Sequence, residues 1–311
     1  IVRAGDGATG AVPLSITGVG GAAGGTGGNN HGIVLETGSD VGASGPVVLK
    51  GTGGPNNAGN RGVLVSGRLA ASTPAGGTPP TLAVTGTGGG SSGSSDNHGV
   101  LIGNQALVSG DGPIVVTGTA GASATSTTSP YVTSSGLYLN SAHVNSADGP
   151  ITFRADSFRL QGTSGAIATG GTAAFENTVE GQTMLLDKPV NVVLARTYAQ
   201  TIRYGTTNAV IEQDVSAAGG DVAVGNAALV VAGSKIRLRA SATSGGAQTW
   251  NGPVVLGEPT SKSVAAGDVR LAGGGITLAS TVDGAKNLTL SSKSAPIAFG
   301  GGQEGGLRSG T

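Results

Sequence analysis

Histidines are the residues of this sequence best suited to acid–base or metal chemistry, and two of them share one repeat position. His31 and His98 each precede a glycine and a short apolar run, and the equivalent position holds Arg61 in the repeat between them and Ser135 in the next one. A stacked column of histidines could bind a metal ion or an anion. Because arginine and serine also fill this position, we interpret it as a polar turn position. His143 lies elsewhere in its repeat.

Carboxylates are the second possible source of chemistry. Cleavage of a glycosidic bond needs two of them on one face of the protein. The candidates do not recur at one repeat position: Asp6, Glu36, Asp40, Asp111, Asp148, Asp156, Asp187 and Asp214. The aromatic residues that could form sugar-binding platforms, Trp250 and the four tyrosines, are dispersed. We therefore assign no catalytic residue and expect the chain not to be an enzyme.

Glycine motifs offer two further interpretations. Gly88-x-Gly90-x-x-Gly93 matches a dinucleotide-binding fingerprint, but Ser91–Asn97 lacks the helical pattern that must follow it. Gly219-Gly220-Asp221 and Gly267-Asp268 are fragments of a Ca²⁺-binding repeat without a tandem copy. We expect these aspartates to close turns and assign no cofactor-binding or metal-ligating residue, although an isolated Ca²⁺ stays open.

The composition excludes several classes of partner. Lys plus Arg and Asp plus Glu number 17 each, so there is no net positive charge to attract nucleic acid. There is no cysteine, which is compatible with export, and no apolar run of membrane-spanning length. Glycine accounts for 60 of 311 residues and aromatics for only 3%, so a narrow core of Val, Leu, Ile and Ala is easier to fill than a wide one.

A repeat of three short strands organises residues 1–155. Its clearest copy is 98–118, with apolar runs at Val100–Ile102, Ala106–Val108 and Ile114–Val116. Prolines 13, 46, 80, 113 and 150 begin the third run of successive repeats and lie 33, 34, 33 and 37 residues apart. Glycine-, serine- and threonine-rich tracts of variable length separate the repeats, at 18–30, 51–60, 86–97 and 118–135. We expect them to be protruding loops.

Residues 156–311 keep the strands and lose the long loops. The expected strands are Phe158–Leu160, Met184–Leu186, Val190–Leu194, Val222–Val224, Leu229–Val231, Ile236–Leu238, Val254–Leu256, Val269–Leu271, Ile276–Leu278, Leu288–Leu290 and Ile297–Phe299. Many alternate in polarity, as half-buried strands do. A unit this short cannot bury its own apolar face, so it must stack on copies of itself. The sequence predicts an all-β parallel β-helix (β-solenoid) with three short strands per coil, forming one continuous rod.

The style of the repeat resembles that of large bacterial surface proteins. The segments Gln248–Gly257 and Ile276–Leu290, together with 98–118 and 135–154, are similar to the β-strand repeats of the filamentous-haemagglutinin-like class, exported by two-partner or autotransporter routes. This resemblance implies a right-handed parallel β-helix, a location outside the cell or on its surface, and an adhesive or structural role.

We accordingly expect a structural or adhesive segment of an exported filament, and a chain that is a piece of a longer protein. The expected partners are further repeats or other copies of the chain, with a host, matrix or polysaccharide ligand as a further candidate. The alternative is a carbohydrate-active or carbohydrate-binding β-helix of the polysaccharide lyase or tailspike type, because residues distant in the sequence can converge by stacking.

Overall fold

The structure, a computed structural model, consists of strands and the turns that join them. It describes residues 1–5, 10–21, 27–103, 105–123, 133–161, 165–178, 184–186, 197–198, 201–205, 212–215, 222–224, 226–233, 235–238, 241–256, 268–284 and 286–300. No helix occurs among these residues, and hence none that could cross a membrane. The chain forms two compact units, Ile1–Val179 with Arg196–Gln200, and Glu180–Ala195 with Thr201–Thr311. They are called unit 1 and unit 2.

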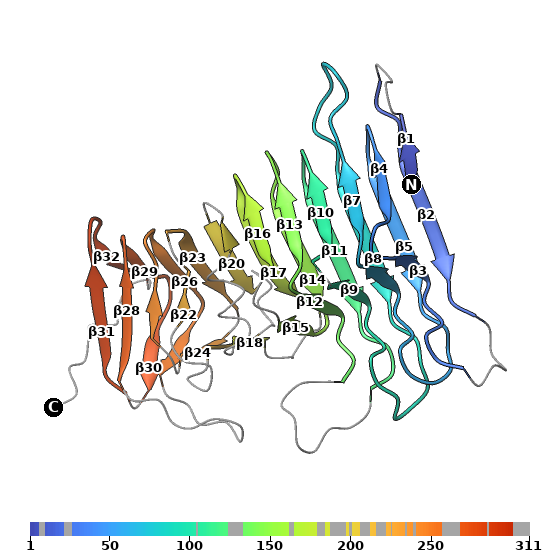
Figure 1. The fold of residues 1–311 in the computed structure, drawn as a ribbon. Coiled ribbons are helices and arrows are strands. Elements are labelled where there is room, and N and C mark those ends of the chain that lie inside the picture. The colour runs from blue at the N-terminus through green and yellow to red at the C-terminus, as the bar shows by residue number, and fades with distance from the viewer. Residues whose placement is uncertain are drawn as a thin grey trace. The chain divides into compact units, whose positions relative to one another are not determined.

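Unit 1 contains three parallel sheets in which each strand pairs with its counterpart from the next coil (Figure 1). Sheet A has the order β1 (Val2–Ala4), β4 (Asp40–Ala43), β7 (Arg68–Ala71), β10 (Leu107–Gly110), β13 (His143–Ser146), β16 (Ala166–Thr169) and β19 (Thr197–Tyr198). Sheet B has β2 (Leu14–Val19), β5 (Val47–Thr52), β8 (Leu82–Thr87), β11 (Ile114–Thr119), β14 (Ile151–Ala155) and β17 (Thr172–Asn177). Sheet C has β3 (Ile33–Leu35), β6 (Val63–Val65), β9 (Val100–Gly103), β12 (Leu137–Asn140) and β15 (Phe158–Gln161).

One coil of unit 1 therefore contributes one strand to each sheet. The chain passes from sheet C to sheet A and then to sheet B, as in β9, β10 and β11, before it enters the next coil. The pairing is in register, so that Ile114 lies beside Leu82 on one side and Ile151 on the other. This architecture confirms the predicted parallel β-solenoid with three strands per coil. It also explains why no crossover helix is needed, because neighbouring strands belong to successive coils.

The core of unit 1 consists of columns of inward side chains that stack along the coils. Leu49, Val84, Val116 and Phe153 occupy one column of sheet B, and each is fully buried. The ring of Phe153 stacks on that of Phe175 with centroids 5.1 Å apart. Residues between these positions point outward, which gives β5 its strict alternation of buried and exposed side chains. Each buried side chain of this size stabilises the fold by about 1.5–3 kcal/mol.

The repeated prolines lie just outside the strands that they were expected to begin. β5, β11 and β14 start one residue after Pro46, Pro113 and Pro150, and β8 starts two residues after Pro80. Each proline can still accept a hydrogen bond, as the carbonyl of Pro113 does from the N–H of Leu82 at 2.9 Å. Proline is suited to this position because its own missing N–H lies beyond the ladder.

Unit 2 repeats the arrangement. Its sheets are β20 (Thr201–Gly205), β23 (Ala228–Ala232), β26 (Gln248–Asn251), β29 (Ile276–Leu278) and β32 (Ile297–Phe299); β18 (Met184–Leu186), β21 (Glu212–Val215), β24 (Lys235–Leu238), β27 (Val254–Leu256) and β30 (Val282–Gly284); and β22 (Val222–Ala223), β25 (Ala242–Thr243), β28 (Val269–Gly273) and β31 (Leu288–Ser292). Trp250 is fully buried, and its Nε1–H donates to Oε1 of the equally buried Gln248 at 3.3 Å.

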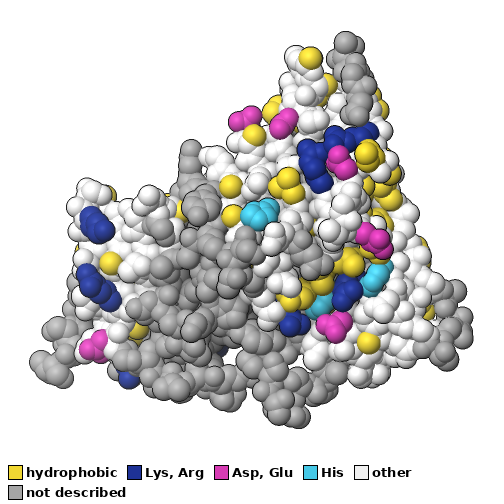
Figure 2. All heavy atoms as spheres, in the orientation of Figure 1, with side chains coloured by type: hydrophobic (Ala, Val, Ile, Leu, Met, Phe, Trp, Pro, Cys, Tyr) yellow, Lys and Arg dark blue, Asp and Glu magenta, His cyan; other side chains and the backbone are white. Residues whose placement is uncertain are grey.

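The expected strands of the second half are present, with one exception that lies outside the described residues, Val190–Leu194. The change of coil style expected near residue 155 falls within unit 1, since β15, β16 and β17 follow it and belong to that unit. The predicted loops at 51–60 and 86–97 contain no strand beyond the last residues of β5 and β8. Charged side chains on the face shown in Figure 2 are scattered in small groups, some of one sign and some of both.

Candidate functional site

The most elaborate polar structure of unit 1 lies where the glycine-rich loops return to the coils. Its first part is an asparagine ladder made of Asn30, Asn60, Asn97 and Ser134, one residue from each of four successive coils. The backbone N–H of Asn30 donates to Asn60 Oδ1 at 2.7 Å, and that of Asn60 to Asn97 Oδ1 at 2.9 Å. The N–H of Asn97 donates to Ser134 Oγ at 3.1 Å. The ladder thus joins neighbouring coils at a point outside the sheets.

The same asparagines also close the loops that precede them. The side-chain amide of Asn30 donates to the carbonyl of Gly27, that of Asn60 to the carbonyl of Asn57, and that of Asn97 to Ser94 Oγ. Each of these partners lies three residues upstream, whatever the length of the loop. The loops can therefore vary in length and sequence while their last residues keep one geometry.

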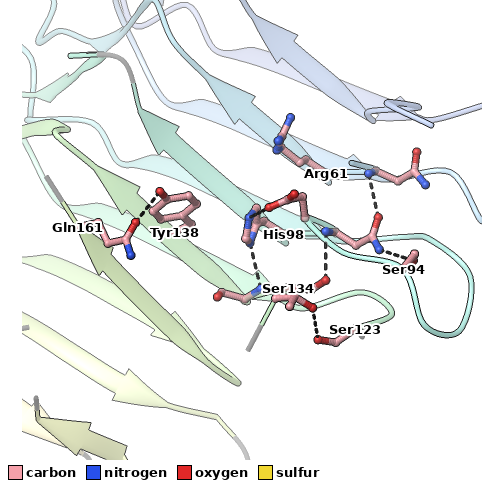
Figure 3. A network of polar contacts seen from close by, with 12 residues as sticks. Arg61, Ser94, His98, Ser123, Ser134, Tyr138 and Gln161 are labelled. Atoms are coloured by element: carbon pink, nitrogen blue, oxygen red, sulfur yellow. Dashed lines mark hydrogen bonds and ion pairs between the residues drawn. The ribbon is translucent and has the colours of Figure 1, made fainter. Parts of the chain in front are cut away.

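The second part is a polar column formed by the next residue of each coil: His31, Arg61, His98 and Ser135. Arg61 and His98 are labelled in Figure 3. His31 Nδ1 accepts the N–H of Arg61 at 3.3 Å, and His98 Nδ1 accepts the N–H of Ser135 at 3.0 Å. Because Nδ1 of His98 is an acceptor, the proton of its neutral ring resides on Nε2. The two histidines thus repeat one contact between coils, at a position that Arg61 and Ser135 also occupy.

His98 is fully buried and surrounded by charged groups. The pKa of His98 is lowered from 6.5 to about 4, mainly because the ring is buried. The positive charges of Arg61 and Arg159 lower this pKa further, whereas the negative charge of Asp96 opposes the decrease. Its Nε2 atom lies 3.5 Å from Asp96 Oδ1 and has no hydrogen-bond partner among the residues that the structure describes. Burial likewise lowers the pKa of His31, aided by Arg61. The ring of His98 is therefore neutral near pH 7.

Tyr138 and Arg159 extend the polar column into the next two coils. The ring of Tyr138 lies 5.0 Å from that of His98, and the guanidinium of Arg159 lies 4.5 Å above the tyrosine ring. The hydroxyl of Tyr138 donates to Gln161 Oε1 at 2.9 Å. An arginine above an aromatic ring contributes roughly 0.5–2 kcal/mol, depending on its exposure to water. These contacts link β12 to β15 through side chains as well as backbone.

Asp96, His98 and Ser135 are the residue types of a hydrolytic triad, but their geometry does not suit that reaction. A catalytic histidine must offer a nitrogen lone pair to the nucleophile. Here that lone pair, on Nδ1, accepts the backbone N–H of Ser135, and both His98 and Ser135 are fully buried. Within the described part of the chain, the Oγ atom of Ser135 has no hydrogen-bond partner. This trio can connect coils but has no access to a substrate.

The carboxylates considered as catalytic candidates hold separate structural contacts. Asp40 binds Arg3 and Arg68 from the two adjacent coils, and these partners lower its pKa, the hydrogen bond from Arg3 most strongly. Asp111 accepts the N–H of Thr73 at 2.6 Å, and Asp156 that of Ala120 at 2.9 Å. Glu36 and Asp148 are exposed. The structure does not describe Asp6 and Asp187 or the side chain of Asp214.

In the described ranges, the glycine motifs and His143 are not joined by the further residues that a cofactor or metal site would need. No helix follows Gly93 there, as the dinucleotide fingerprint would require, and no three His, Cys, Asp or Glu side chains of the described residues converge as metal ligands would. Of the Ca²⁺-repeat fragments, Asp268 precedes β28, whereas 219–221 and Gly267 lie outside the described part. His143 is on the outward face of β13, beside Leu107 and Ala166.

Sequence reasoning identified the polar column but missed the asparagine ladder. The signal was present as the recurring triplets Asn30-His31-Gly32, Asn60-Arg61-Gly62 and Asn97-His98-Gly99. A repeated asparagine before a strand could be interpreted as the end of a loop. Its bond to the next coil depends on stacking, which is visible only in three dimensions. Comparisons of the chain with family models, curated proteins and solved structures gave no match.

Proposed function

We propose that the chain is a structural and adhesive segment of a filament located on the surface of the cell or outside it. The observation that carries the proposal is the incompletely covered core at the end coils. Ile297 and Phe299 of β32 are 37% and 49% exposed, whereas their register partners Ile276 and Leu278 are 1% and 0% exposed. A further coil, from the same chain or from a second copy, would cover them and remove apolar surface from water.

The first coil of unit 1 has the same property. Leu14 and Ile16 of β2 are only half-buried, while their partners Val47 and Leu49 are fully buried. Among the described strands, β2 pairs only with β5, and β32 only with β29. A strand that is paired on one side only is a template for another strand. Solenoids extend readily by adding repeats, because each coil contacts only its neighbours.

The asparagine ladder suits this role. It maintains the coil geometry while the loops at 18–30, 51–60 and 86–97 differ in length, so binding loops can diversify on a constant rod. The filamentous-haemagglutinin-like style of the repeats supports an exported protein, and the absence of cysteine is compatible with export.

The location can be tested with antibodies raised against residues 86–97, an epitope in a loop. Intact cells that produce the protein should bind the antibody along extracellular filaments in immunogold microscopy, and protease added outside should abolish the label. Deletion of the gene should remove the label and reduce attachment to surfaces. Labelling only after the cells are permeabilised would overturn the proposal.

A further inference from the structure

The outer face of sheet A contains a groove that the structural role does not use. It has a volume of about 530 Å³ and crosses the strands β7, β10, β13 and β16. Its floor is made by the register-paired outward residues Ala70, Ser109, Asn145 and Ala168. The groove exists because three of these four side chains are small. Four adjacent strands span about 14 Å, which matches a short oligosaccharide running along the coil axis.

One side of the groove is formed by the last residues of β13 and β16, Ser146 and Thr169, and hydrogen bonds fix their positions. Ser146 Oγ donates to the carbonyl of Gly112 at 2.7 Å and accepts the N–H of Gly149 at 3.0 Å. Thr169 repeats this contact one coil further, since its Oγ1 donates to the carbonyl of Gly149. These hydroxyls are buried and fully engaged. The groove is therefore built before a ligand arrives, which lowers the entropic cost of binding.

Other polar groups of the groove have bonding capacity left. No protein group bonds to the side chains of Ser109 and Asn145 in the described part of the chain, and the Oδ1 atom of Asp111 is likewise without a described partner. Arg68 uses one amino group for Asp40, at 3.0 Å, and has five N–H donors in total. The groove thus offers donors and acceptors side by side, together with one positive and one negative group.

We propose that this sheet A groove binds a neutral polysaccharide. A sugar hydroxyl both donates and accepts hydrogen bonds, as do Ser109 and the amide of Asn145 together. A polyanion is disfavoured because Asp111 lies in the groove and Arg68 is already paired with Asp40. A peptide that buries large apolar side chains is disfavoured because the apolar part of the floor consists only of the methyl groups of Ala70 and Ala168, beside the polar Ser109 and Asn145. An extended polymer also fits a groove that crosses four neighbouring coils.

No aromatic side chain is among the described residues that line the groove. Contact with each sugar therefore depends on hydrogen bonds, and a single groove binds weakly. Many grooves in one filament would bind one polysaccharide cooperatively through effective concentration, without stronger individual contacts. This inference gives a ligand class to the adhesive part of the proposed function and depends on it for its biological use.

Affinity electrophoresis of the full 311-residue chain tests the proposal. The gels contain a neutral polysaccharide (hydroxyethylcellulose, dextran or mannan) or the anionic alginate, and retardation gives an apparent Kd. We expect retardation by at least one neutral polymer. Asn145→Ala should raise that Kd about tenfold, the effect of losing one or two hydrogen bonds. Ser109→Ile should abolish retardation, because it removes a hydroxyl and fills the groove while its β-branched side chain suits a strand.

Thr85→Ile is the matched control, since Thr85 is exposed on sheet B, away from the groove. It should be retarded like the original chain, and circular dichroism should show that all three variants are folded. No retardation by the neutral polymers, retardation by alginate alone, or equal retardation of Ser109→Ile would each overturn the groove assignment. Surface labelling by the loop antibody would be unaffected by such a failure, so the two proposals fail independently.

Discussion

Asn97 Oδ1 accepts a hydrogen bond from the backbone N–H of Asn60, which lies 37 positions earlier in the chain, at 2.9 Å. Both residues are fully buried, so neither group can bond to water instead. The contact joins the ends of two loops of different sequence. It fixes the position of one coil on the next, in addition to the hydrogen bonds within the sheets.

Replacement of this acceptor should be costly. Asn97→Ala leaves the N–H of Asn60 buried without a partner and also removes the amide contacts to Ser94 and Ala122. We expect the free energy of unfolding to fall by about 2 kcal/mol, the usual cost of a buried unsatisfied group. Urea denaturation followed by circular dichroism measures it. Asn140→Ala, at the half-buried end of β12, is the control and should change stability by less than about 0.5 kcal/mol. Equal effects of the two substitutions would contradict the role of the ladder.

The buried imidazole of His98 should make unit 1 sensitive to acid. Its pKa is lowered to about 4, so between pH 6.5 and 4 the unfolded chain binds a proton that the folded chain does not. The stabilisation by His98 is therefore complete above pH 6.5 and is lost as the pH falls toward 4. The difference between the pKa values of His98 in the unfolded and folded chain corresponds to a loss of about 3 kcal/mol in the free energy of unfolding at low pH.

Urea titrations between pH 7 and pH 4 measure this dependence. His98→Asn, which retains a hydrogen-bond acceptor, should flatten the decrease in stability across that range. His143→Asn, on the outward face of β13, should leave the decrease as it is in the original chain. If His98→Asn has the same pH dependence as the original chain, His98 is not the titrating group.

Glycines at one corner of the coil should not tolerate a side chain. A Cβ at Gly86 would lie 2.1 Å from the carbonyl oxygen of Gly99, and Gly51 and Gly118 face Gly62 and Gly136 in the same way. Gly86→Ala should lower the free energy of unfolding by about 3 kcal/mol, because two backbone segments must separate. Gly27→Ala is the control, since its Cβ would contact none of the described residues within 4 Å. A thermal melt in which both variants behave alike would disprove the steric role of this corner.

Much of the fold could be predicted because its determinants are local. Short runs such as Ile114–Val116, bounded by proline and glycine, define a strand whatever surrounds them, and β11 contains that run. The spacing of the prolines gave the coil period. The in-register stacking then follows from burying each apolar run against its copy.

The site could be predicted only in part because its contacts cross between coils. The ring centroids of His98 and Tyr138 lie 5.0 Å apart, although Tyr138 follows His98 by 40 positions in the sequence. The burial of Gln248 could not be predicted for the same reason. Its side-chain amide donates to the carbonyls of Ala242 and Ala272, which belong to different strands. The sheet A groove also depends on which small residues coincide on adjacent strands, and that coincidence requires the register.

The central claim is that the exposed core of the end coil is a stacking surface. Sedimentation velocity of the 311-residue chain over a hundredfold range of concentration tests it most directly. The account predicts concentration-dependent end-to-end assembly that Phe299→Asp abolishes and that Val48→Asp, an outward position 41% exposed, leaves intact. A chain that stays monomeric at every concentration, or a Phe299→Asp variant that assembles as the original does, would contradict it.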